Sequence, residues 1–197
     1  MEEEKVNEVF RRLNAGGVRY ALIGGLAYAE YAPPRATEDM DVIVLVEDAR
    51  KVRALFPGCY RRGTAIAEIY DFEGVKLDVQ PARRRVQAAV VANVVDGAFH
   101  GEPVKVACLR DLIFLKIWAA QERKERLKRE QDLVDAGDFL NHNPDKVTRS
   151  DIAWIAKNLL SMAYTPEEVT KYRGAVEWLN QMLDDLGMSD RKFTPPC

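Results

Sequence analysis

The chain has 197 residues, 47% of them hydrophobic, and a formal net charge of −2 from 29 basic and 31 acidic residues. This allows one large domain, or a domain with a small addition, and a sizeable core. It excludes a chain that is basic throughout, as a nucleic-acid clamp would be. No run of about 18 apolar residues predicts a membrane span, and the acidic start MEEEKVNEVF is unlike a signal peptide.

Cysteines and histidines are few and widely spaced. Cys59, Cys108 and Cys197 form no CxxC pair, and His100 and His142 lie far apart in the chain. This pattern favours a reducing cytoplasm and argues against disulfides and zinc. We therefore expect a cytoplasmic protein whose chemistry does not depend on several histidines.

The N-terminal part alternates between short helices and short strands. Helical spacing, β-branched runs and Gly or Pro breaks define its elements. The continuous apolar run of the second strand predicts burial on both faces. In chain order, we expect a helix over 3–14, a strand over 20–23, a helix over 26–31 that follows a double glycine, a strand over 40–46 and a helix over 47–56.

Residues 64–80, TAIAEIYDFEGVKLDVQ, predict a β-hairpin that turns at Glu73-Gly74. In its second arm Val75, Leu77 and Val79 face one way, and Lys76, Asp78 and Gln80 face the other. Residues 83–95 are ambiguous and include a helix among the alternatives. Gly101 and Pro103 indicate a second, smaller strand pair, with residues 104–106 as its second arm.

From residue 109 onward the pattern is helical. We expect helices over 109–140, over 150–162 with Ser150 as its cap, and from Thr165-Pro166 to about 186. The charged run at 121–131 is expected to be an exposed helix face. The predicted organisation is an α/β part over 1–106, a helical part over 107–188 and a frayed tail over 189–197.

Two carboxylates open the buried strand. On a strand, Asp39 and Asp41 point to the same face, about 6.5–7 Å apart. Two like charges this close are costly unless a cation sits between them, and Mg²⁺ prefers carboxylate oxygens together with water and phosphate ligands. If the arm that carries Asp78 pairs beside this strand, three carboxylates converge in the manner of a two-metal site.

The residues upstream of this pair suit a phosphate group. A strand followed by Gly24-Gly25 leaves backbone N–H groups able to approach phosphate closely. Arg35 is placed to neutralise phosphate charge or to contact the base or ribose. Thr37 is placed to orient a neighbouring group through a hydrogen bond.

The stretch IGGLAYAEYAPPRATEDMDVIV, with the later VKLDV, resembles the DNA polymerase β-like nucleotidyltransferase superfamily. The Arg-x-Thr-x-Asp-x-Asp form looks most like the branch that contains the AbiEii-type toxins. The resemblance implies a mixed sheet with flanking helices, Mg²⁺ or Mn²⁺, two ions in number, and transfer of a nucleotidyl group from an NTP to an acceptor hydroxyl. It implies Gly24 and Gly25 for the phosphates, and Asp39, Asp41 and Asp78 as catalytic, metal-binding acids.

The resemblance extends into the helical part, where LRDLIFLKIWAAQ makes Lys116 a nucleotide-binding residue. A later Lys-Asp-x-x-Asp-like element departs from the family pattern, because Gln131 precedes Asp132 and Asp135. The AbiEii likeness favours RNA or protein as the acceptor, a toxin or stress role and an antitoxin partner. Neither DNA nor a membrane is expected as a partner. Arg83-Arg84-Arg85 is a candidate seat for acceptor phosphates.

Simpler interpretations stand beside these. Asp39 and Asp41 suit a solvated loop, Gly24-Gly25 an ordinary turn, and Lys116 a lysine with a buried stem and an exposed head. Arg35 and Thr37 suit local loop contacts. The alternatives for the whole chain are a non-catalytic nucleotide-binding regulator with the same fold, and a metal-dependent nuclease. A small molecule such as an aminoglycoside is the other acceptor class.

Overall fold

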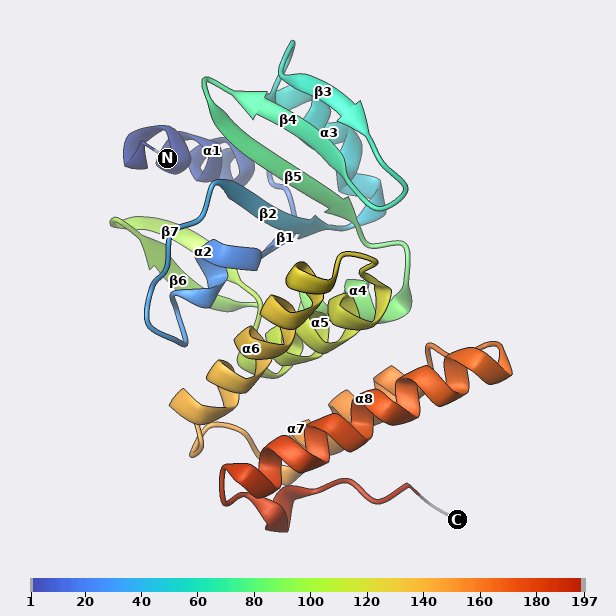
Figure 1. Ribbon diagram of the computed structural model, residues 1–197. Coiled ribbons are helices and arrows are strands. Elements are labelled where there is room, and N and C mark those ends of the chain that lie inside the picture. Colours follow the sequence, from blue (N-terminus) through green and yellow to red (C-terminus); the bar gives the residue numbers. More distant parts are fainter. Residues whose placement is uncertain (1, 196–197) are drawn as a thin grey trace. The chain divides into compact units, whose positions relative to one another are not determined.

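The structure is a computed structural model that describes residues 2–195. The chain forms two compact units, Met1–Cys108 and Leu109–Cys197. The first unit is built on a β-sheet with helices on its faces, and the second is helical (Figure 1).

The first unit follows the predicted alternation. Its elements are α1 (Glu3–Ala15), β1 (Tyr20–Ile23), α2 (Gly24–Tyr28), β2 (Asp39–Val44), the 3-10 turn η1 (Val46–Asp48), α3 (Ala49–Leu55), β3 (Tyr60–Gly63), β4 (Glu68–Phe72), β5 (Val75–Pro81), α4 (Arg85–Ala92), β6 (Val95–Phe99) and β7 (Glu102–Val106). The second unit contains α5 (Leu109–Glu122), α6 (Arg126–His142), α7 (Arg149–Leu160), α8 (Pro166–Asp185) and the 3-10 turn η2 (Ser189–Arg191).

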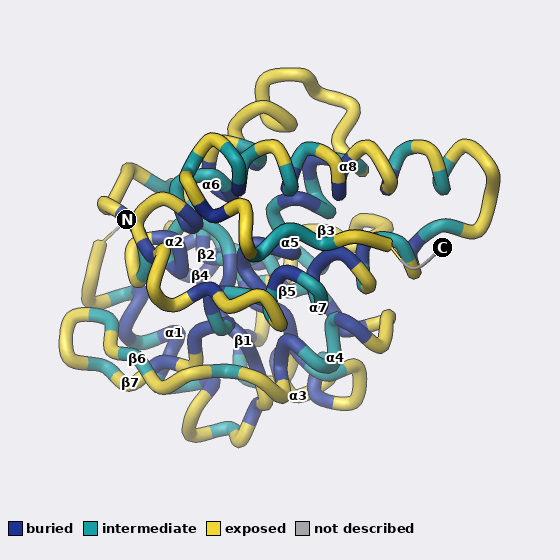
Figure 2. The backbone as a smooth tube through the Cα atoms, turned by 90° about the horizontal axis from the view of Figure 1, so that it is seen from below, coloured by how far each residue is buried: buried dark blue, intermediate teal, exposed yellow. Residues whose placement is uncertain are grey.

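Within the described residues the sheet has seven strands in the order β3-β4-β5-β2-β1-β7-β6. It is mixed, because β2 pairs with β5 and β1 with β7 in parallel, whereas the other neighbours are antiparallel. The predicted mixed sheet with flanking helices, followed by a helical part, is confirmed. In Figure 2 the central strands are largely buried, while β3 and β6 at the two edges are more exposed.

The two faces of the sheet have different partners. One face packs against α1 and α3, where Phe10 stacks on Tyr20 with ring centroids 6.3 Å apart and Phe56 meets Phe72 at 5.6 Å. Leucine, valine and methionine side chains of β2 and β5 fill this interface because they alternate with polar residues. The helices α2 and α4 lie against the other face.

Several boundaries in the first unit differ from the sequence prediction. The first arm of the hairpin begins at Glu68 rather than at residue 64, because residues 64–67 form a turn in which Thr64 and Ala67 are hydrogen-bonded, and the second arm extends to Pro81. The segment over 47–56 begins as the 3-10 turn η1 and becomes α-helical only at Ala49. The ambiguous region over 83–95 resolves into α4 followed by the start of β6.

The helical unit also corrects three predictions. The segment over 109–140 is two helices, so its charged run spans a break between α5 and α6. The cap of α7 is Thr148, which accepts a hydrogen bond from the backbone N–H of Asp151, rather than Ser150. The tail is docked rather than frayed over part of its length, since Arg191 and Phe193 are hydrogen-bonded. Cys197 and residue 196 lie outside the described residues.

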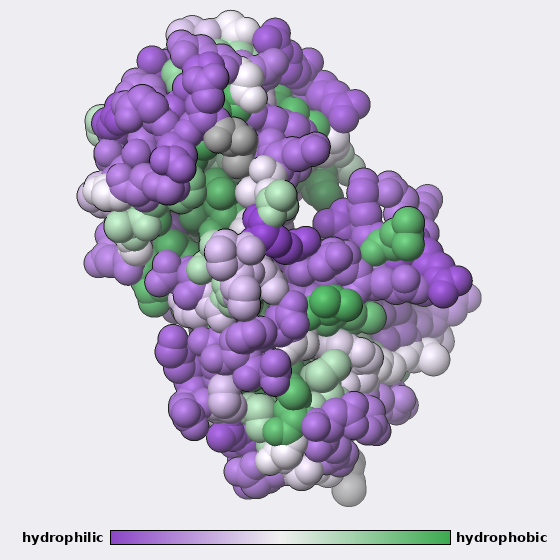
Figure 3. Space-filling view, turned by 60° about the vertical axis from the view of Figure 1, so that its left-hand side comes forward, coloured by the Kyte–Doolittle hydropathy of each residue, from purple (hydrophilic) through white to green (hydrophobic). Residues whose placement is uncertain are grey.

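Figure 3 shows one face of the molecule, where hydrophilic residues cover most of the surface and apolar residues form small separate patches. Scattered exposed apolar side chains of this kind are ordinary for a folded protein. Among the described residues, no helix is long and apolar enough to cross a membrane.

Candidate active site

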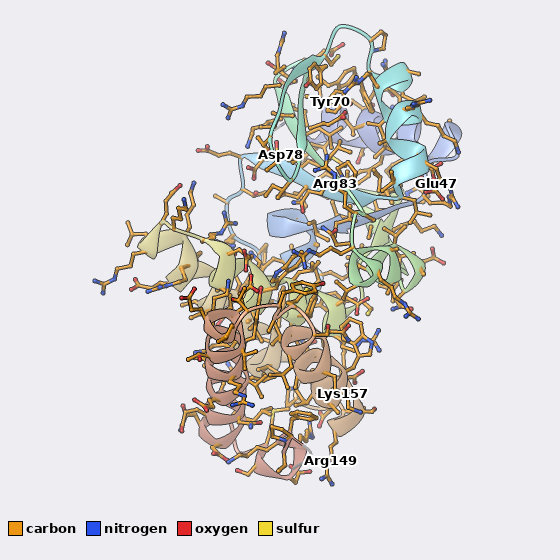
Figure 4. All side chains as sticks on the ribbon, turned by 90° about the vertical axis from the view of Figure 1, so that its right-hand side faces the viewer. Glu47, Tyr70, Asp78, Arg83, Arg149 and Lys157 are labelled. Carbon is orange, nitrogen blue, oxygen red and sulfur yellow. The ribbon has the colours of Figure 1, made fainter. Side chains whose placement is uncertain are left out.

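The pairing of β2 with β5 brings the predicted acids to one face of the sheet. Asp41 is the register partner of Asp78, and Asp39 is the partner of Lys76. Partners on neighbouring strands project to the same face, so three carboxylates share the face opposite α1 and α3. In Figure 4 Asp78 lies on the side of the sheet away from α3, and Tyr70, which contacts Phe56, lies on the α3 side.

The double glycine lets the backbone approach this face. Gly24 has φ +70°, and a Cβ at this position would lie 2.2 Å from Oδ2 of Asp41. A Cβ on Gly25 would lie 2.5 Å from Oγ1 of Thr37. Both contacts are shorter than any side chain tolerates, so the two glycines are required for the close packing of α2 against β2 and its preceding loop.

The loop before β2 is held by local contacts. The Thr37 hydroxyl donates a hydrogen bond to the backbone carbonyl of Asp39 at 3.2 Å and approaches its carboxylate at 3.5 Å. The Arg35 guanidinium lies 5.0 Å from the ring centre of Tyr28, which is buried in α2. Thr37 therefore fixes the start of β2, and Tyr28 provides a cation–π surface for Arg35.

Lys76 is the residue of this face that motif matching missed. Its Nζ lies 2.9 Å from Oδ2 of Asp39 and 3.3 Å from Oδ2 of Asp78. The hydrogen bond to Asp39 is the main cause that raises the pKa of Lys76 above its ordinary value, so the side chain is charged at neutral pH. The alternation of β5 already places Lys76 on the same side as Asp78, and that pattern was the available signal.

These side chains fit a cation chemically. Carboxylate oxygens are the ligands that hard divalent cations prefer, the ammonium of Lys76 already lies between Asp39 and Asp78, and Oδ1 of Asp78 is buried without a hydrogen-bond partner. In the part of the chain that the structure describes, no three acidic, His or Cys side chains are grouped as ready-made metal ligands. A divalent cation at this face would share the carboxylates of Asp39 and Asp78 with the Lys76 ammonium.

Lys116 lies in the second unit, on α5. Its Nζ is 3.0 Å from Oδ1 of Asp132 and 2.6 Å from Oδ2 of Asp135, and both aspartates are on α6. Arg123 also pairs with Asp132, and Gln131 donates a hydrogen bond to Asp135. Asp132 and Asp135 are therefore buried in an ion-pair network. The role of Lys116 in nucleotide binding stays a prediction.

The arginine cluster lies at the end of β5. Arg83 donates a hydrogen bond to the carbonyl of Ala65 at 2.5 Å, and Figure 4 shows it near the end of β5 that leads into α4. Arg84 is at the N-cap position of α4, and Arg85 is exposed in the first turn of that helix. These cations are positioned by the turn from β5 into α4.

Solved structures share this architecture. An antigenic nucleotidyltransferase-like protein from Paracoccidioides brasiliensis is 19% identical, with a TM-score of 0.65 over 98% of this chain and 94% of that one. The chain has a nucleotidyltransferase fold. ANT(2'')-Ia, solved in complex with adenylyl-2''-tobramycin, is 12% identical, with a TM-score of 0.60 over 82% of this chain and 98% of that one. No protein-family model and no curated protein matches the sequence.

Proposed function

We propose that this protein is a metal-dependent nucleotidyltransferase that moves a nucleoside monophosphate from an NTP to an acceptor hydroxyl. The observation that carries the proposal is the register of β2 and β5, which places Asp41 beside Asp78 with Asp39 on the same face. The sequence motif and the fold of the neighbours support it from two other directions.

Each residue then has a defined task. Asp39 and Asp41 hold the cations that accompany the triphosphate, and Asp78 completes the set on the acceptor side. The backbone of Gly24 and Gly25 contacts the phosphates, and Arg35 adds positive charge. Thr37 keeps the first carboxylate in place through its hydrogen bond to Asp39.

The reaction is a displacement at the α-phosphorus. Two Mg²⁺ or Mn²⁺ ions, when bound, neutralise phosphate charge and lower the pKa of the acceptor hydroxyl. The acceptor oxygen forms a bond to the α-phosphorus, the bond to the β-phosphate oxygen breaks and pyrophosphate leaves. The acceptor proton passes to Asp78 or to water. The protein contributes mainly by positioning and by electrostatic stabilisation.

For the acceptor, the AbiEii-type motif supports RNA or protein, and with it a toxin or stress role in the cytoplasm and an antitoxin partner. The cations of Arg83, Arg84 and Arg85 follow directly on β5 and offer a seat for acceptor phosphates. Binding to RNA through these side chains would weaken as salt rises.

A small-molecule hydroxyl is the second candidate acceptor. The observation that favours it is the complex of ANT(2'')-Ia with adenylylated tobramycin, whose fold covers 82% of this chain. The near-neutral net charge of −2 also suits an acceptor smaller than a nucleic acid.

The first test uses the four α-³²P-labelled NTPs with Mg²⁺ or Mn²⁺, total RNA and cell protein. The wild type is compared with a variant that carries Asp39→Ala and Asp41→Ala. Label that moves to RNA or protein only with the wild type supports the proposal and identifies base and acceptor class. A second set of reactions offers aminoglycosides and other polyols, with products separated by thin-layer chromatography.

Other outcomes select the alternatives. Tight binding of NTP with Mg²⁺ and no labelled product on any acceptor would favour the non-catalytic regulator. Steady RNA cleavage without an NTP would favour the nuclease. Normal labelling by the double aspartate variant would show that the assigned acids are wrong.

A further inference from the structure

Lys76 holds the position that a cation would take on the carboxylate face. Its ammonium bridges Asp39 on β2 and Asp78 on β5, at 2.9 and 3.3 Å. We propose that Lys76 is a built-in competitor for the divalent cation, so that an ion binds these carboxylates only when the lysine has moved away. The inference rests on the proposed function because it assumes that these acids bind metal.

The charge balance explains why a lysine is tolerated here. Three aspartates on one face repel each other, and an ammonium between two of them offsets part of that repulsion. Oδ1 of Asp78 has no hydrogen-bond partner and remains for a divalent cation, while the oxygens that the ammonium occupies lower the affinity for that cation.

The side chain is free to make this exchange. Lys76 is 45% exposed and Asp39 is 37% exposed, so the ion pair is open to water and is held weakly. A lysine has a long flexible stem, and its ammonium can turn into solvent without disturbing the backbone pairing of β5. Asp78 is only 18% exposed, and its Oδ1 has no hydrogen-bond partner, so it retains an oxygen for a new ligand.

The exchange has a measurable consequence. Removal of the positive charge at this position frees oxygens of both carboxylates and raises the negative charge of the face. Divalent cations should then bind more tightly, by roughly tenfold or more. A variant that keeps the charge should retain the weaker affinity.

The experiment measures Mn²⁺ binding to metal-free protein without nucleotide, from the loss of the free-ion electron paramagnetic resonance signal. Lys76→Met and Lys76→Gln remove the charge, and Lys76→Arg retains it. Lys105→Met is the matched control, because Lys105 is 50% exposed and pairs with Asp96 on another strand pair. Asp41→Asn reports on the metal site itself. Circular dichroism melts establish that each variant is folded.

Tighter Mn²⁺ binding by the Met and Gln variants, with Lys76→Arg and Lys105→Met close to the wild type, supports the inference. If the folded Met and Gln variants bind Mn²⁺ no more tightly than the wild type, the role of Lys76 is overturned. The proposed metal site still stands in that case if the wild type binds Mn²⁺ and Asp41→Asn does not. If Lys76→Arg binds Mn²⁺ as tightly as the Met and Gln variants do, the role of the Lys76 charge is also overturned. No Mn²⁺ binding by any variant rejects both the role of Lys76 and the metal-dependent function.

Discussion

Two clusters of aspartate and lysine, one in each unit, differ in their ion pairing and exposure. On the sheet, Asp39, Asp41 and Asp78 share a partly exposed face with Lys76. Between α5 and α6, Asp132 and Asp135 are buried and are paired with Lys116 and Arg123. In the helical cluster two cations pair with two aspartates. On the sheet, one lysine pairs with both Asp39 and Asp78.

The difference indicates which cluster is built for a ligand. A buried, internally paired network needs no further ion, and it holds two helices in one arrangement. A part-exposed face with three carboxylates leaves oxygens that a cation from solution can bind. A lysine next to two aspartates is therefore not a functional signal by itself, and the exposure of the carboxylates is the feature that separates the two clusters.

The largest expected effect comes from neutralising one acid in each cluster. Asp41→Asn should lower nucleotidyl transfer by about 10³-fold, or about 4 kcal/mol in activation free energy. Its free energy of unfolding should change by less than about 1 kcal/mol, because Asp41 is only partly buried. Asp135→Asn should lower the free energy of unfolding by about 3 kcal/mol, because Lys116 loses a buried partner.

Label transfer from the α-³²P NTP and urea unfolding measure the two quantities on the same preparations. Asp96→Asn is the matched control, since Asp96 is an exposed acid on β6 and should change neither quantity. If Asp41→Asn lost stability and Asp135→Asn did not, the roles of the two clusters would be reversed: the sheet cluster would be structural and the helical cluster would be the candidate ligand site.

Much of the sheet could be predicted because its strands carry local signals. The run at β1 and the alternation in β5 set both the strand positions and the face of Asp78. The edge strand β3 could not be found, because Tyr60, Arg61 and Arg62 are all exposed and show no apolar alternation. Its pairing with β4 includes a contact between the rings of Tyr60 and Tyr70, which the sequence alone does not bring together.

The site shows the same division between local and non-local information. Asp39 and Asp41 share a face by strand geometry alone, and Gly24 stands out by its position after a strand. The proximity of Asp78 depended on which strand lies beside β2, and the ion pair of Lys76 with Asp39 depends on the register. The ion pair of Lys116 with Asp132 forms because the chain breaks between α5 and α6 and the two helices pack together. That break could not be predicted, because the residues around it have good helix propensity.

The two lysines should differ most clearly in stability. Lys116 is 14% exposed and faces two buried aspartates, so Lys116→Met should lower the free energy of unfolding by about 3 kcal/mol. Lys76 is more exposed, so Lys76→Met should change it by less than about 1 kcal/mol in metal-free buffer. Urea unfolding of both variants at pH 7 is the measurement. Equal losses for the two would contradict the comparison.

The next effect concerns the backbone beside Asp41. Gly24→Ala adds a methyl group 2.2 Å from Oδ2 of Asp41 at a residue with φ +70°. We expect a loss of about 2 kcal/mol in stability and at least a tenfold loss of transfer, because the carboxylate must move. Gly17→Ala is the matched control, since Gly17 has φ +58° and no atom within 4 Å of the added carbon. It should lose about 1 kcal/mol and keep its activity.

The smallest expected effect concerns Asp48, a buried acid of the first unit that is paired with cations as the acids of the helical cluster are. Asp48 accepts a hydrogen bond from Arg19 and pairs with Lys51, and these contacts hold the pKa of its carboxyl well below the usual range. A lowered pKa in the folded state stabilises the protein above the unfolded value of about 4, and this contribution is lost as the pH falls below it. The free energy of unfolding should therefore fall more between pH 7 and pH 3 for the wild type than for Asp48→Asn, by about 1–2 kcal/mol. Parallel pH dependences of the two proteins in urea unfolding would mean that the charge of Asp48 contributes no stability. Burial of an acid with cationic partners would then not be enough to identify a stabilising ion-pair network.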